Sequence, residues 1–471
     1  MGIATVNPAT GEQVETFEPL DDQDLDAALE RAAVAAAAYR RTSFADRATW
    51  TLALADLLER DRDDIARIMT VEMGKTLAAA KAEVEKCARA FRFYAGRAEA
   101  MLADEPADAE AVGAERAFTR YQPLGPVLAV MPWNFPLWQV VRFAAPALMA
   151  GNVGLLKHAS NVPRTAVLIE DVVRRAGFPA DVFQTLLIGS GQVERVLRDE
   201  RVRAATLTGS EPAGRAVASV AGDVVKPTVL ELGGSDAYVV TASADVAEAA
   251  RVAVVARVQN NGQSCIAAKR FIVVDDVADE FERRFVDGMA ALRVGDPMDE
   301  KTDVGPLATE QGRRDIEELV ADAVDKGATV LCGGQRPEGP GWYYPPTVLT
   351  GVTPDMRMFH DEVFGPVAPV YRVPDNDAAI ELANATAFGL GSNVWTTDPA
   401  EQERFVDELD AGAVFVNGMV TSYPELPFGG VKTSGYGREL SAQGIRAFCN
   451  AKTVWVGDGV RGGPTSTAHS E

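Results

Sequence analysis

Two short segments of the sequence place a reactive side chain beside glycines. Residues 259–265 read Gln-Asn-Asn-Gly-Gln-Ser-Cys and end at Cys265, and residues 231–234 read Glu-Leu-Gly-Gly and begin at Glu231. Glycine lets a substrate approach the backbone closely, and a thiol near a carboxylate is a typical nucleophile and base. An ordinary buried thiol and a solvated carboxylate at a strand end are the structural alternatives for these two residues.

The surroundings of the two side chains bear on their reactivity. A free thiol has a pKa of about 8.5, so only a minority is ionised at neutral pH. We expect residues 266–269 to form a helix, whose backbone N–H groups would lower the pKa of the Cys265 thiol. Glu231 ends an apolar segment, where partial desolvation would raise the pKa of its carboxyl group towards that of a general base.

Asn134 lies within residues 132–136, Pro-Trp-Asn-Phe-Pro, where two prolines restrict the backbone. Its amide can donate to an oxyanion that develops in a reaction, and the loss of one such donor typically costs roughly 10²–10³ in rate. The alternative is a turn-capping asparagine.

Residues 209–214, Gly-Ser-Glu-Pro-Ala-Gly, follow an apolar segment and precede a predicted helix. Free N–H groups at such a helix start can hold a pyrophosphate, although the segment is not the usual G-x-G-x-x-G. Lys157 ends another predicted strand and can reach a ribose or a phosphate; a solvated charge is the alternative.

Arg142 lies in an otherwise uncharged stretch beyond Asn134. A guanidinium group without an acidic neighbour in the sequence can bind a substrate carboxylate through two parallel hydrogen bonds. The alternative is an ion pair with a residue distant in the sequence.

The surrounding pattern is of apolar strands alternating with amphipathic helices, which indicates parallel sheets covered on both faces. We expect a turn that leads into a strand at 123–131, a strand that ends at 154–157, and further strands at 182–186, 203–208, 229–232, 270–274 and 413–417. We expect helices at 24–41, 46–72, 77–102, 165–177 and 311–326.

Length and composition narrow the class of protein. A chain of 471 residues is too long for a single core and predicts two or three domains. The net charge of −22 argues against a nucleic-acid partner. It indicates a solvated acidic surface or adaptation to high salt. The four cysteines are scattered, so we expect neither a disulfide framework nor a metal site, and we expect a reducing cytoplasm.

Two segments bear on membranes and targeting. The N-terminus lacks a basic region and a long apolar core, so no signal peptide is expected. Residues 121–141 carry no charge, but four prolines and Asn134 interrupt them. A buried strand followed by an irregular loop therefore fits better than a membrane span.

Taken together, the motifs resemble those of the aldehyde dehydrogenase superfamily over nearly the whole chain. The resemblance also includes Asn-Pro-Ala-Thr-Gly-Glu near the start. The signatures occur in the family's order at residues 132–136, 231–234, 260–265, 362–366 and 427–432. Within the superfamily the chain looks most like the succinate-semialdehyde dehydrogenase group, which has Lys-His-Ala-Ser or Lys-His-Ala-Pro after the second strand.

The resemblance implies a reaction. The Cys265 thiolate would attack an aldehyde carbon, and Asn134 with the Cys265 backbone N–H would hold the resulting oxyanion. Transfer of a hydride to a nicotinamide would leave a thioester, and Glu231 would activate the water that hydrolyses it to a carboxylic acid. The resemblance also places Lys157 both with these catalytic residues and at the adenosine ribose.

The remaining cofactor contacts are also implied by the resemblance. The residues expected at NADP or NAD are Trp133, Lys157, Ser160, Gly209, Ser210, Gly214, Glu231, Leu232, Glu362 and Phe364. Many members have a glutamate where this chain has Ser160, and that glutamate repels a 2′-phosphate. We therefore expect NADP to be accepted, with NAD also used.

The same resemblance assigns Arg142 and Ser422 to the acid end of succinate semialdehyde. Another small aliphatic or hydroxy aldehyde and a CoA-acylating semialdehyde dehydrogenase are the alternatives, although CoA-acylating enzymes typically lack the Glu231 carboxylate. A cysteine hydrolase would need a histidine partner, but His158 and His360 lie in cofactor-side motifs. A non-catalytic protein would not need Cys265, Glu231 and Asn134.

The resemblance implies an α/β architecture with a Rossmann-like cofactor domain, a catalytic domain and a small oligomerisation sheet. We expect residues 1–111, 124–232 and 428–445 in the first and 233–427 in the second. Residues 112–123 and 446–456 would form the third, and 457–471 a disordered tail. Relatives are homodimers or homotetramers that bind a small aldehyde, with no membrane or nucleic-acid partner.

Overall fold

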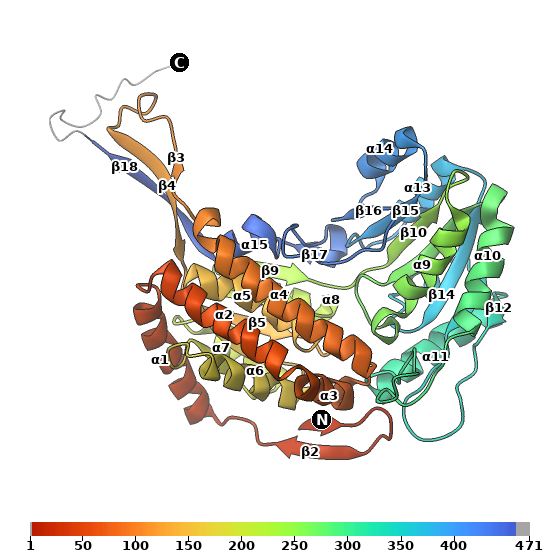
Figure 1. Cartoon of the computed structure of the whole chain (residues 1–471), viewed down its shortest axis with the longest axis horizontal. Coiled ribbons are helices and arrows are strands. Elements are labelled where there is room, and N and C mark those ends of the chain that lie inside the picture. The colour runs from red at the N-terminus through yellow and green to blue at the C-terminus, as the bar shows by residue number, and fades with distance from the viewer. Residues whose placement is uncertain (1, 458–471) are drawn as a thin grey trace.

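The computed structural model describes residues 2–457. The tail that we predicted to be disordered therefore lies, from residue 458 on, outside the described residues. Two large sheets, each with helices on both faces, account for most of the chain (Figure 1). This arrangement confirms the predicted α/β class.

The first sheet has six strands and is parallel except at one edge. Its spatial order is β17 (Gly435–Tyr436), β9 (Thr228–Glu231), β8 (Ala204–Thr208), β5 (Pro126–Met131), β6 (Val153–His158) and β7 (Phe183–Thr185). Only β17 runs antiparallel. Alternate residues face opposite cores: Val127 and Ala129 face one, and Leu128 faces the other.

Helices bury both faces of this sheet. One face packs against α1 (Asp22–Tyr39), α7 (Val193–Arg198) and α8 (Glu211–Asp223). The other packs against α2 (Phe44–Arg60), α4 (Leu77–Met101), α5 (Trp138–Ala150) and α6 (Pro163–Arg175). The single helix predicted at 46–72 is wrong, because the chain breaks at Asp61 between α2 and α3 (Arg62–Met73).

The second sheet has seven strands. Its order is β12 (Thr329–Cys332), β13 (Thr347–Thr350), β14 (Val367–Val373), β11 (Ala268–Val274), β10 (Asp236–Val240), β15 (Ser392–Trp395) and β16 (Val414–Val416). Its two faces are covered by α9 (Val246–Val258) and α10 (Asp275–Ala290), and by α11 (Glu310–Asp325), α13 (Asn376–Asn384) and α14 (Pro399–Glu408).

Smaller elements complete the chain. β1 (Ile3–Val6) pairs with β2 (Gln13–Phe17), and the short helices α12 (Arg357–His360) and α15 (Ser441–Arg446) lie in connections. β18 (Cys449–Val456), β4 (Arg116–Pro123) and β3 (Glu105–Pro106) form an antiparallel sheet that projects from the body as an arm (Figure 1). The sequence did not predict β3.

One predicted element near the reactive thiol is wrong. Residues 266–269 do not form a helix, because the chain turns at 266–267 and enters β11 at Ala268. The β-branched and aromatic residues of β11 favour a strand buried between two neighbours.

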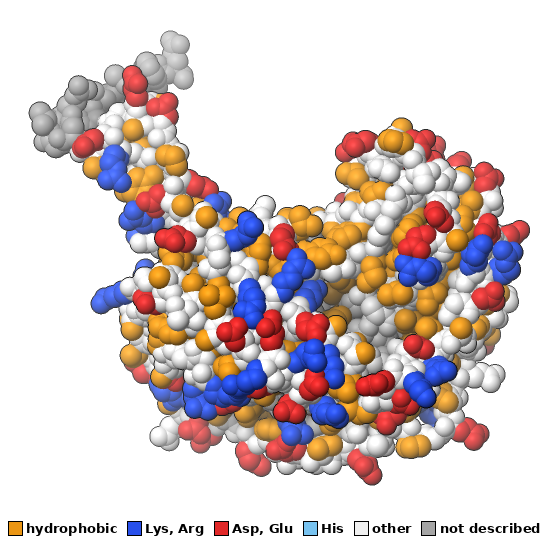
Figure 2. Space-filling view, in the orientation of Figure 1, with side chains coloured by type: hydrophobic (Ala, Val, Ile, Leu, Met, Phe, Trp, Pro, Cys, Tyr) orange, Lys and Arg blue, Asp and Glu red, His pale blue; other side chains and the backbone are white. Residues whose placement is uncertain are grey.

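The visible surface carries side chains of both charge signs. Lysine and arginine are interspersed with aspartate and glutamate over the visible face, which is hollowed between the arm and the lobe that carries α14 (Figure 2). Within residues 2–457, no helix is both long enough and apolar enough to cross a membrane.

Candidate active site

A cleft of about 240 Å³ lies where the strand order of the six-stranded sheet reverses. In open parallel sheets this point, beyond the carboxyl ends of the strands, is where ligands bind. Its walls come from loops after β5, β8 and β9 and from segments before β11 and β14. The lining residues are Pro132, Trp133, Asn134, Thr208, Gly209, Ser210, Leu232, Gly233, Cys265, Glu362 and Phe364.

The loop that carries Cys265 has a backbone that few sequences can adopt. Asn260 and Asn261 have φ of 55° and 58°, and Gly262 has φ of 75°. Asparagine tolerates this left-handed region better than most residues. A Cβ on Gly262 would lie 2.3 Å from the carbonyl carbon of Gly365, so only glycine fits. The motif around Cys265 therefore specifies a backbone shape.

Side chains of this loop also fasten it to other parts of the chain. The Asn261 amide donates to the carbonyl oxygens of Gly74 and Pro306 at 2.9 and 3.0 Å. Lys269 donates to the carbonyl oxygens of Ser264 and Cys265 at 2.8 and 2.7 Å. The sulfur is thus presented to the cleft from a fixed backbone.

The Cys265 thiol is not activated in the way the sequence suggested. Cys265 is half-buried at the cleft wall, and burial raises the pKa of its thiol to about 11, although Arg142 and Lys269 act in the opposite direction. The expected lowering by a helix is wrong because no helix follows the residue. In this arrangement the thiol is protonated at neutral pH.

Asn134 is tied directly to the cysteine loop. Its Nδ2 donates to the carbonyl oxygen of Gln263 at 3.2 Å, and its own carbonyl oxygen accepts from Asn260 Nδ2 at 2.7 Å. Its Oδ1 accepts from the Phe135 N–H at 3.0 Å. The Asn134 NH₂ group is therefore turned towards the cysteine loop, and it bonds to a residue two positions before Cys265.

Glu231 ends β9 and is buried, and neither carboxylate oxygen has a hydrogen-bond partner. Burial is the main cause that raises the pKa of this carboxyl group well above its ordinary value, and Arg142 and Arg438 oppose it. A Cβ on Gly429 would lie 2.7 Å from Glu231 Oε1, so the side chain packs against that glycine. In this arrangement Glu231 does not line the cleft, and burial favours the neutral form of its carboxyl group.

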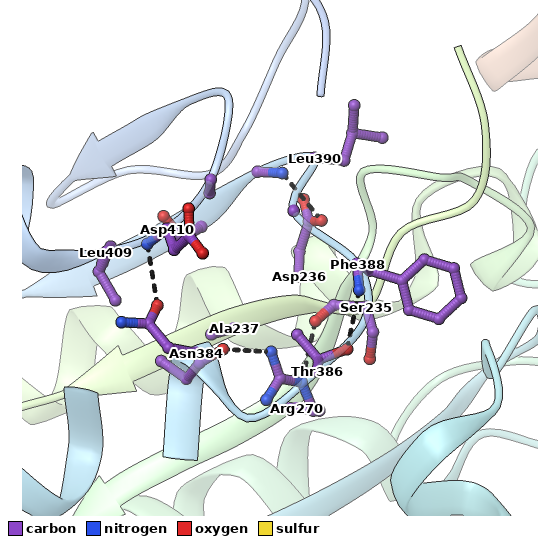
Figure 3. Close-up of a pocket in the computed structure, with 15 residues that line it drawn as sticks. Ser235, Asp236, Ala237, Arg270, Asn384, Thr386, Phe388, Leu390, Leu409 and Asp410 are labelled. Carbon is purple, nitrogen blue, oxygen red and sulfur yellow. Dashed lines mark hydrogen bonds between the residues drawn. The ribbon is translucent and has the colours of Figure 1, made fainter. Parts of the chain in front are cut away.

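The chain that follows Glu231 is anchored to the second sheet (Figure 3). Arg270 donates to the Ser235 carbonyl oxygen at 2.9 Å. Asp236 accepts from the Gly391 N–H at 3.1 Å, and burial raises the pKa of its carboxyl group to about 6. These bonds fix the Gly-Gly segment that leads from one sheet to the other.

Glu362 and Phe364 occupy the cleft wall opposite β5 and β8. Glu362 Oε1 accepts from the Gly234 N–H at 3.1 Å and lies 3.4 Å from Lys269 Nζ. Burial raises the pKa of the Glu362 carboxyl group. The rings of Phe364 and Trp133 meet edge to face, with centroids 5.7 Å apart.

The N-terminus of α8 borders the same cleft. Ser210 is the N-cap residue, but its side chain makes no capping hydrogen bond, so N–H groups of the first turn remain open to a ligand. A Cβ on Gly214 would lie 2.5 Å from Leu232 Cδ2. Gly214 therefore serves first to let α8 pack closely on the chain after β9.

Lys157 and Ser160 lie apart from this lining. Lys157 is buried, and burial lowers the pKa of its ammonium group. Ser160 borders a narrow crevice with His158 and Ile188, and its carbonyl oxygen accepts from the Ala4 N–H at 3.0 Å. The structure thus brings Cys265, Asn134, Gly209, Ser210, Glu362 and Phe364 together, and it places these two residues beyond them.

Arg142 is engaged by the protein itself. Its guanidinium group pairs with Glu439, donates to Thr208 Oγ1 at 3.2 Å, and lies 4.4 Å from the Phe428 ring centroid. This arrangement is the distant ion pair that we gave as the alternative to a substrate contact. The absence of a nearby acid in the sequence was misleading, because α15 and the segment before it return to this sheet.

The loop that carries Asn134 has supports that the sequence analysis did not identify. Glu83 of α4 accepts from the N–H groups of Leu137 and Trp138 at 2.9 and 2.8 Å. His158 Nε2 donates to the Pro136 carbonyl oxygen at 2.8 Å, and burial lowers the pKa of its ring to about 4. The sequence does hold a signal for this role, because the spacing of Glu83 places its carboxylate on the apolar face of α4.

The two histidines that the structure describes do not activate the thiol. His158 supports the loop, and His360 contacts the Pro354 carbonyl oxygen at 2.7 Å. Within residues 2–457, neither ring is hydrogen-bonded to Cys265. This geometry disfavours a cysteine hydrolase.

Comparisons with known proteins agree with this geometry. The sequence model described as "Aldehyde dehydrogenase family" matches residues 1–454. A "Succinate-semialdehyde dehydrogenase [NADP(+)]" of Mycobacterium avium (strain 104) is 66% identical over 463 residues, 98% of each chain. A solved succinic semialdehyde dehydrogenase from Streptococcus pyogenes, in complex with NADP+, is 38% identical. It has a TM-score of 0.94, and the match covers 97% of this chain and 100% of that chain. The structure titled "Structural insights into cofactor and substrate selection by Gox0499" is 40% identical, with a TM-score of 0.95 and the same coverage.

The support of the Asn134 loop by Glu83 can be tested by stability. Glu83 forms a fully buried ion pair with Lys75. Glu83→Gln keeps an acceptor for the two N–H groups but leaves the ammonium group unpaired, so we expect the free energy of unfolding to fall by about 3–5 kcal/mol. Adding Lys75→Met should restore most of the loss in urea denaturation. A single variant as stable as the parent, or a double variant with additive losses, would contradict this role.

Proposed function

The chain belongs to the aldehyde dehydrogenase family, and from that premise we propose that it oxidises succinate semialdehyde to succinate with NADP⁺. The observation that carries the proposal is a single cleft lined by a cysteine, by an asparagine fixed to the cysteine loop, and by an open helix N-terminus. The names of the relatives support the substrate and the cofactor. The overall reaction converts aldehyde, water and NADP⁺ into carboxylate, NADPH and two protons.

The first half of the reaction is acylation of the sulfur. The Cys265 thiol gives its proton to water, and the thiolate attacks the aldehyde carbon, which forms a C–S bond and places a negative charge on the former carbonyl oxygen. We assign the Asn134 amide and the Cys265 backbone N–H to that oxygen, because both belong to one fixed network. Fixed donors of this kind stabilise the charge without reorganisation. The oxyanion then re-forms a C=O bond as the carbon loses a hydride, which leaves a thioester.

The second half is hydrolysis of the thioester. Glu231 removes a proton from a water molecule, whose oxygen attacks the thioester carbon. The C–S bond then breaks, and the proton on Glu231 passes to the departing sulfur, which releases the acid and the free thiol. A buried carboxylate without hydrogen bonds is a strong base once it is ionised. Because Glu231 packs against Gly429 in the structure, its side chain must turn towards Cys265 for this step.

The cleft fits a nicotinamide dinucleotide. The open N–H groups after Ser210 suit a pyrophosphate, and Glu362 suits the hydroxyls of the nicotinamide ribose. Trp133 and Phe364 would flank the ring end. When bound, the oxidised nicotinamide would accept the hydride that the hemithioacetal carbon loses. We place Lys157 and Ser160 at the adenosine ribose, where serine leaves room for a 2′-phosphate.

We propose that the six-stranded sheet is the core of the cofactor domain, with residues 1–111, 124–232 and 428–445, and that 233–427 form the catalytic domain. The arm would join subunits into a homodimer or homotetramer. β18 is an edge strand whose free side can accept a strand from another copy, and Trp455 on it is 52% exposed. The four free thiols agree with our proposal of a cytoplasmic enzyme.

Cofactor choice can be tested at Ser160. Ser160→Glu should lower kcat/KM for NADP⁺ relative to NAD⁺ by roughly tenfold or more, because a carboxylate beside the 2′-phosphate is repulsive. Ser160→Gln, which adds bulk without charge, is the matched control. The assignment fails if the parent enzyme strongly prefers NAD⁺ and Ser160→Glu does not change the ratio.

The role of Glu231 can be tested by separating the two halves of the reaction. Glu231→Gln should still release one equivalent of NADPH in a burst, whereas the steady-state rate should fall by roughly 10²–10⁴. In the parent, thioester hydrolysis should accelerate as the pH rises, because a carboxyl group with a raised pKa gains its basic form at a higher pH than an ordinary glutamate. Assaying the product with and without CoA shows whether water or CoA accepts the acyl group. Loss of the burst together with the steady state would contradict a role confined to hydrolysis.

A further inference from the structure

A buried lysine outside the sequence motifs lies against the loop that carries Cys265. Lys269 of β11 is 0% exposed, and its Nζ donates to the carbonyl oxygens of Ser264, Cys265 and Ala267 at 2.8, 2.7 and 3.3 Å. An ammonium group has three N–H bonds, and these three acceptors account for all of them. The ammonium group therefore has one fixed position, next to the backbone that presents the sulfur.

The same ammonium group lies beside an acid of the cleft wall. Lys269 Nζ is 3.4 Å from Glu362 Oε1. Within residues 2–457, no other lysine or arginine forms an ion pair with Glu362. Arg257 and Arg270, which are also buried in this region, donate to backbone carbonyl oxygens instead. Lys269 is thus the only counter-charge of Glu362 in the part of the chain that the structure describes.

The two glycines that follow Glu231 and Leu232 bring the cysteine loop and Glu362 into contact. A Cβ on Gly234 would lie 2.6 Å from the Cys265 carbonyl oxygen, and a Cβ on Gly233 would lie 2.6 Å from Glu362 Oε2. Glu362 Oε1 accepts from the Gly234 N–H at 3.1 Å. Three segments from distant parts of the sequence therefore meet here, and the ammonium group joins two of them.

The Glu362 carboxylate has one oxygen left for a ligand. Oε1 is engaged by the Gly234 N–H and by Lys269, whereas Oε2 accepts no hydrogen bond from residues 2–457. Glu362 lines the cleft, and its side chain is 21% exposed. Burial raises the pKa of its carboxyl group, and the charge of Lys269 is the largest cause that opposes this rise. Lys269 therefore favours the ionised form, which is the stronger acceptor of hydroxyl groups.

The charge of Lys269 also acts on the thiol. Burial raises the pKa of the Cys265 thiol to about 11, and Arg142 and Lys269 oppose that rise. Arg142 is paired with Glu439, whereas Lys269 is hydrogen-bonded to the carbonyl oxygen of the cysteine itself. A cation held at this distance favours the thiolate, which is the nucleophilic form of the side chain.

We propose that Lys269 is a positioning residue for both partners of the hydride transfer: it fixes the loop that carries the Cys265 sulfur, and it holds Glu362 so that Oε2 receives the nicotinamide ribose. This inference rests on the proposed function for the ribose at Glu362, and it does not depend on which aldehyde is the substrate. One charge then supports both cofactor affinity and thiol reactivity, so its loss weakens the two together.

The test measures NADP⁺ binding and thiol labelling separately, without aldehyde, in the full chain. Lys269→Met should raise the Kd for NADP⁺, measured by calorimetry, by roughly tenfold or more. Labelling of Cys265 by iodoacetamide at one fixed pH, read by peptide mass spectrometry, should slow by roughly threefold or more, because its rate depends on the thiolate fraction. Lys269→Arg, which keeps the charge, should recover part of both losses. Lys269→Gln, which keeps N–H donors without the charge, is the matched control and should recover neither.

A double-mutant cycle separates this role from general support of the loop. Glu362→Gln should raise the Kd for NADP⁺ in the parent but much less in Lys269→Met, because the ammonium group acts on the cofactor through that carboxylate. Urea denaturation of each variant gives the stability that each substitution costs. If Lys269→Met does not fold, the comparison of Lys269→Arg with Lys269→Gln decides the question with the same two measurements.

Three results would overturn the inference. The first is equal recovery by Lys269→Arg and Lys269→Gln, which would make the hydrogen bonds sufficient without the charge. The second is an additive effect of Lys269→Met and Glu362→Gln on NADP⁺ binding. The third is a Glu362→Gln variant with the parent's affinity for NADP⁺, which would also reject the ribose assignment. Because these assays contain no aldehyde, a parent that does not oxidise succinate semialdehyde would reject the proposed substrate alone.

Discussion

The active-site geometry depends on the hydrogen bonds that tie the Asn134 loop to the Cys265 loop. Asn260 Nδ2 donates to the Asn134 carbonyl oxygen at 2.7 Å, and the Asn134 amide returns a bond to Gln263. One loop follows a strand of the six-stranded sheet and the other precedes a strand of the seven-stranded sheet. These few bonds therefore fix the sulfur relative to the asparagine amide that we propose as the oxyanion donor, and they join segments of two separate sheets.

Around this link the chain buries several ionisable groups, which differ in whether they have an ionic or hydrogen-bond partner. Lys75 and Glu83 neutralise each other under the Asn134 loop, and Arg142 is balanced by Glu439. Glu231 is left without hydrogen bonds, and burial raises the pKa of its carboxyl group. Buried charges without partners are costly and are therefore expected where they act on a ligand.

Much of this could be predicted from the sequence, because the motifs encode local backbone shape. The Asn-Asn-Gly run needs left-handed residues, and the alternation of strands and helices predicts the class of fold. Three features could not be predicted. The thiol has a raised pKa because burial depends on both sheets, and residues 266–269 enter a buried strand. Arg142 meets Glu439, which lies far along the chain and returns only through the tertiary fold.

The central claim is that the substrate's carbonyl carbon is bound to the sulfur of Cys265 as a thioester once that carbon has lost a hydride. The most direct measurement is mass spectrometry of Glu231→Gln, quenched in acid after mixing with succinate semialdehyde and NADP⁺. We predict a protein heavier by one succinyl group, with the added mass on the peptide that contains Cys265. NADPH formed in stoichiometric amount with no added mass on that peptide, or added mass on another residue, would contradict the account.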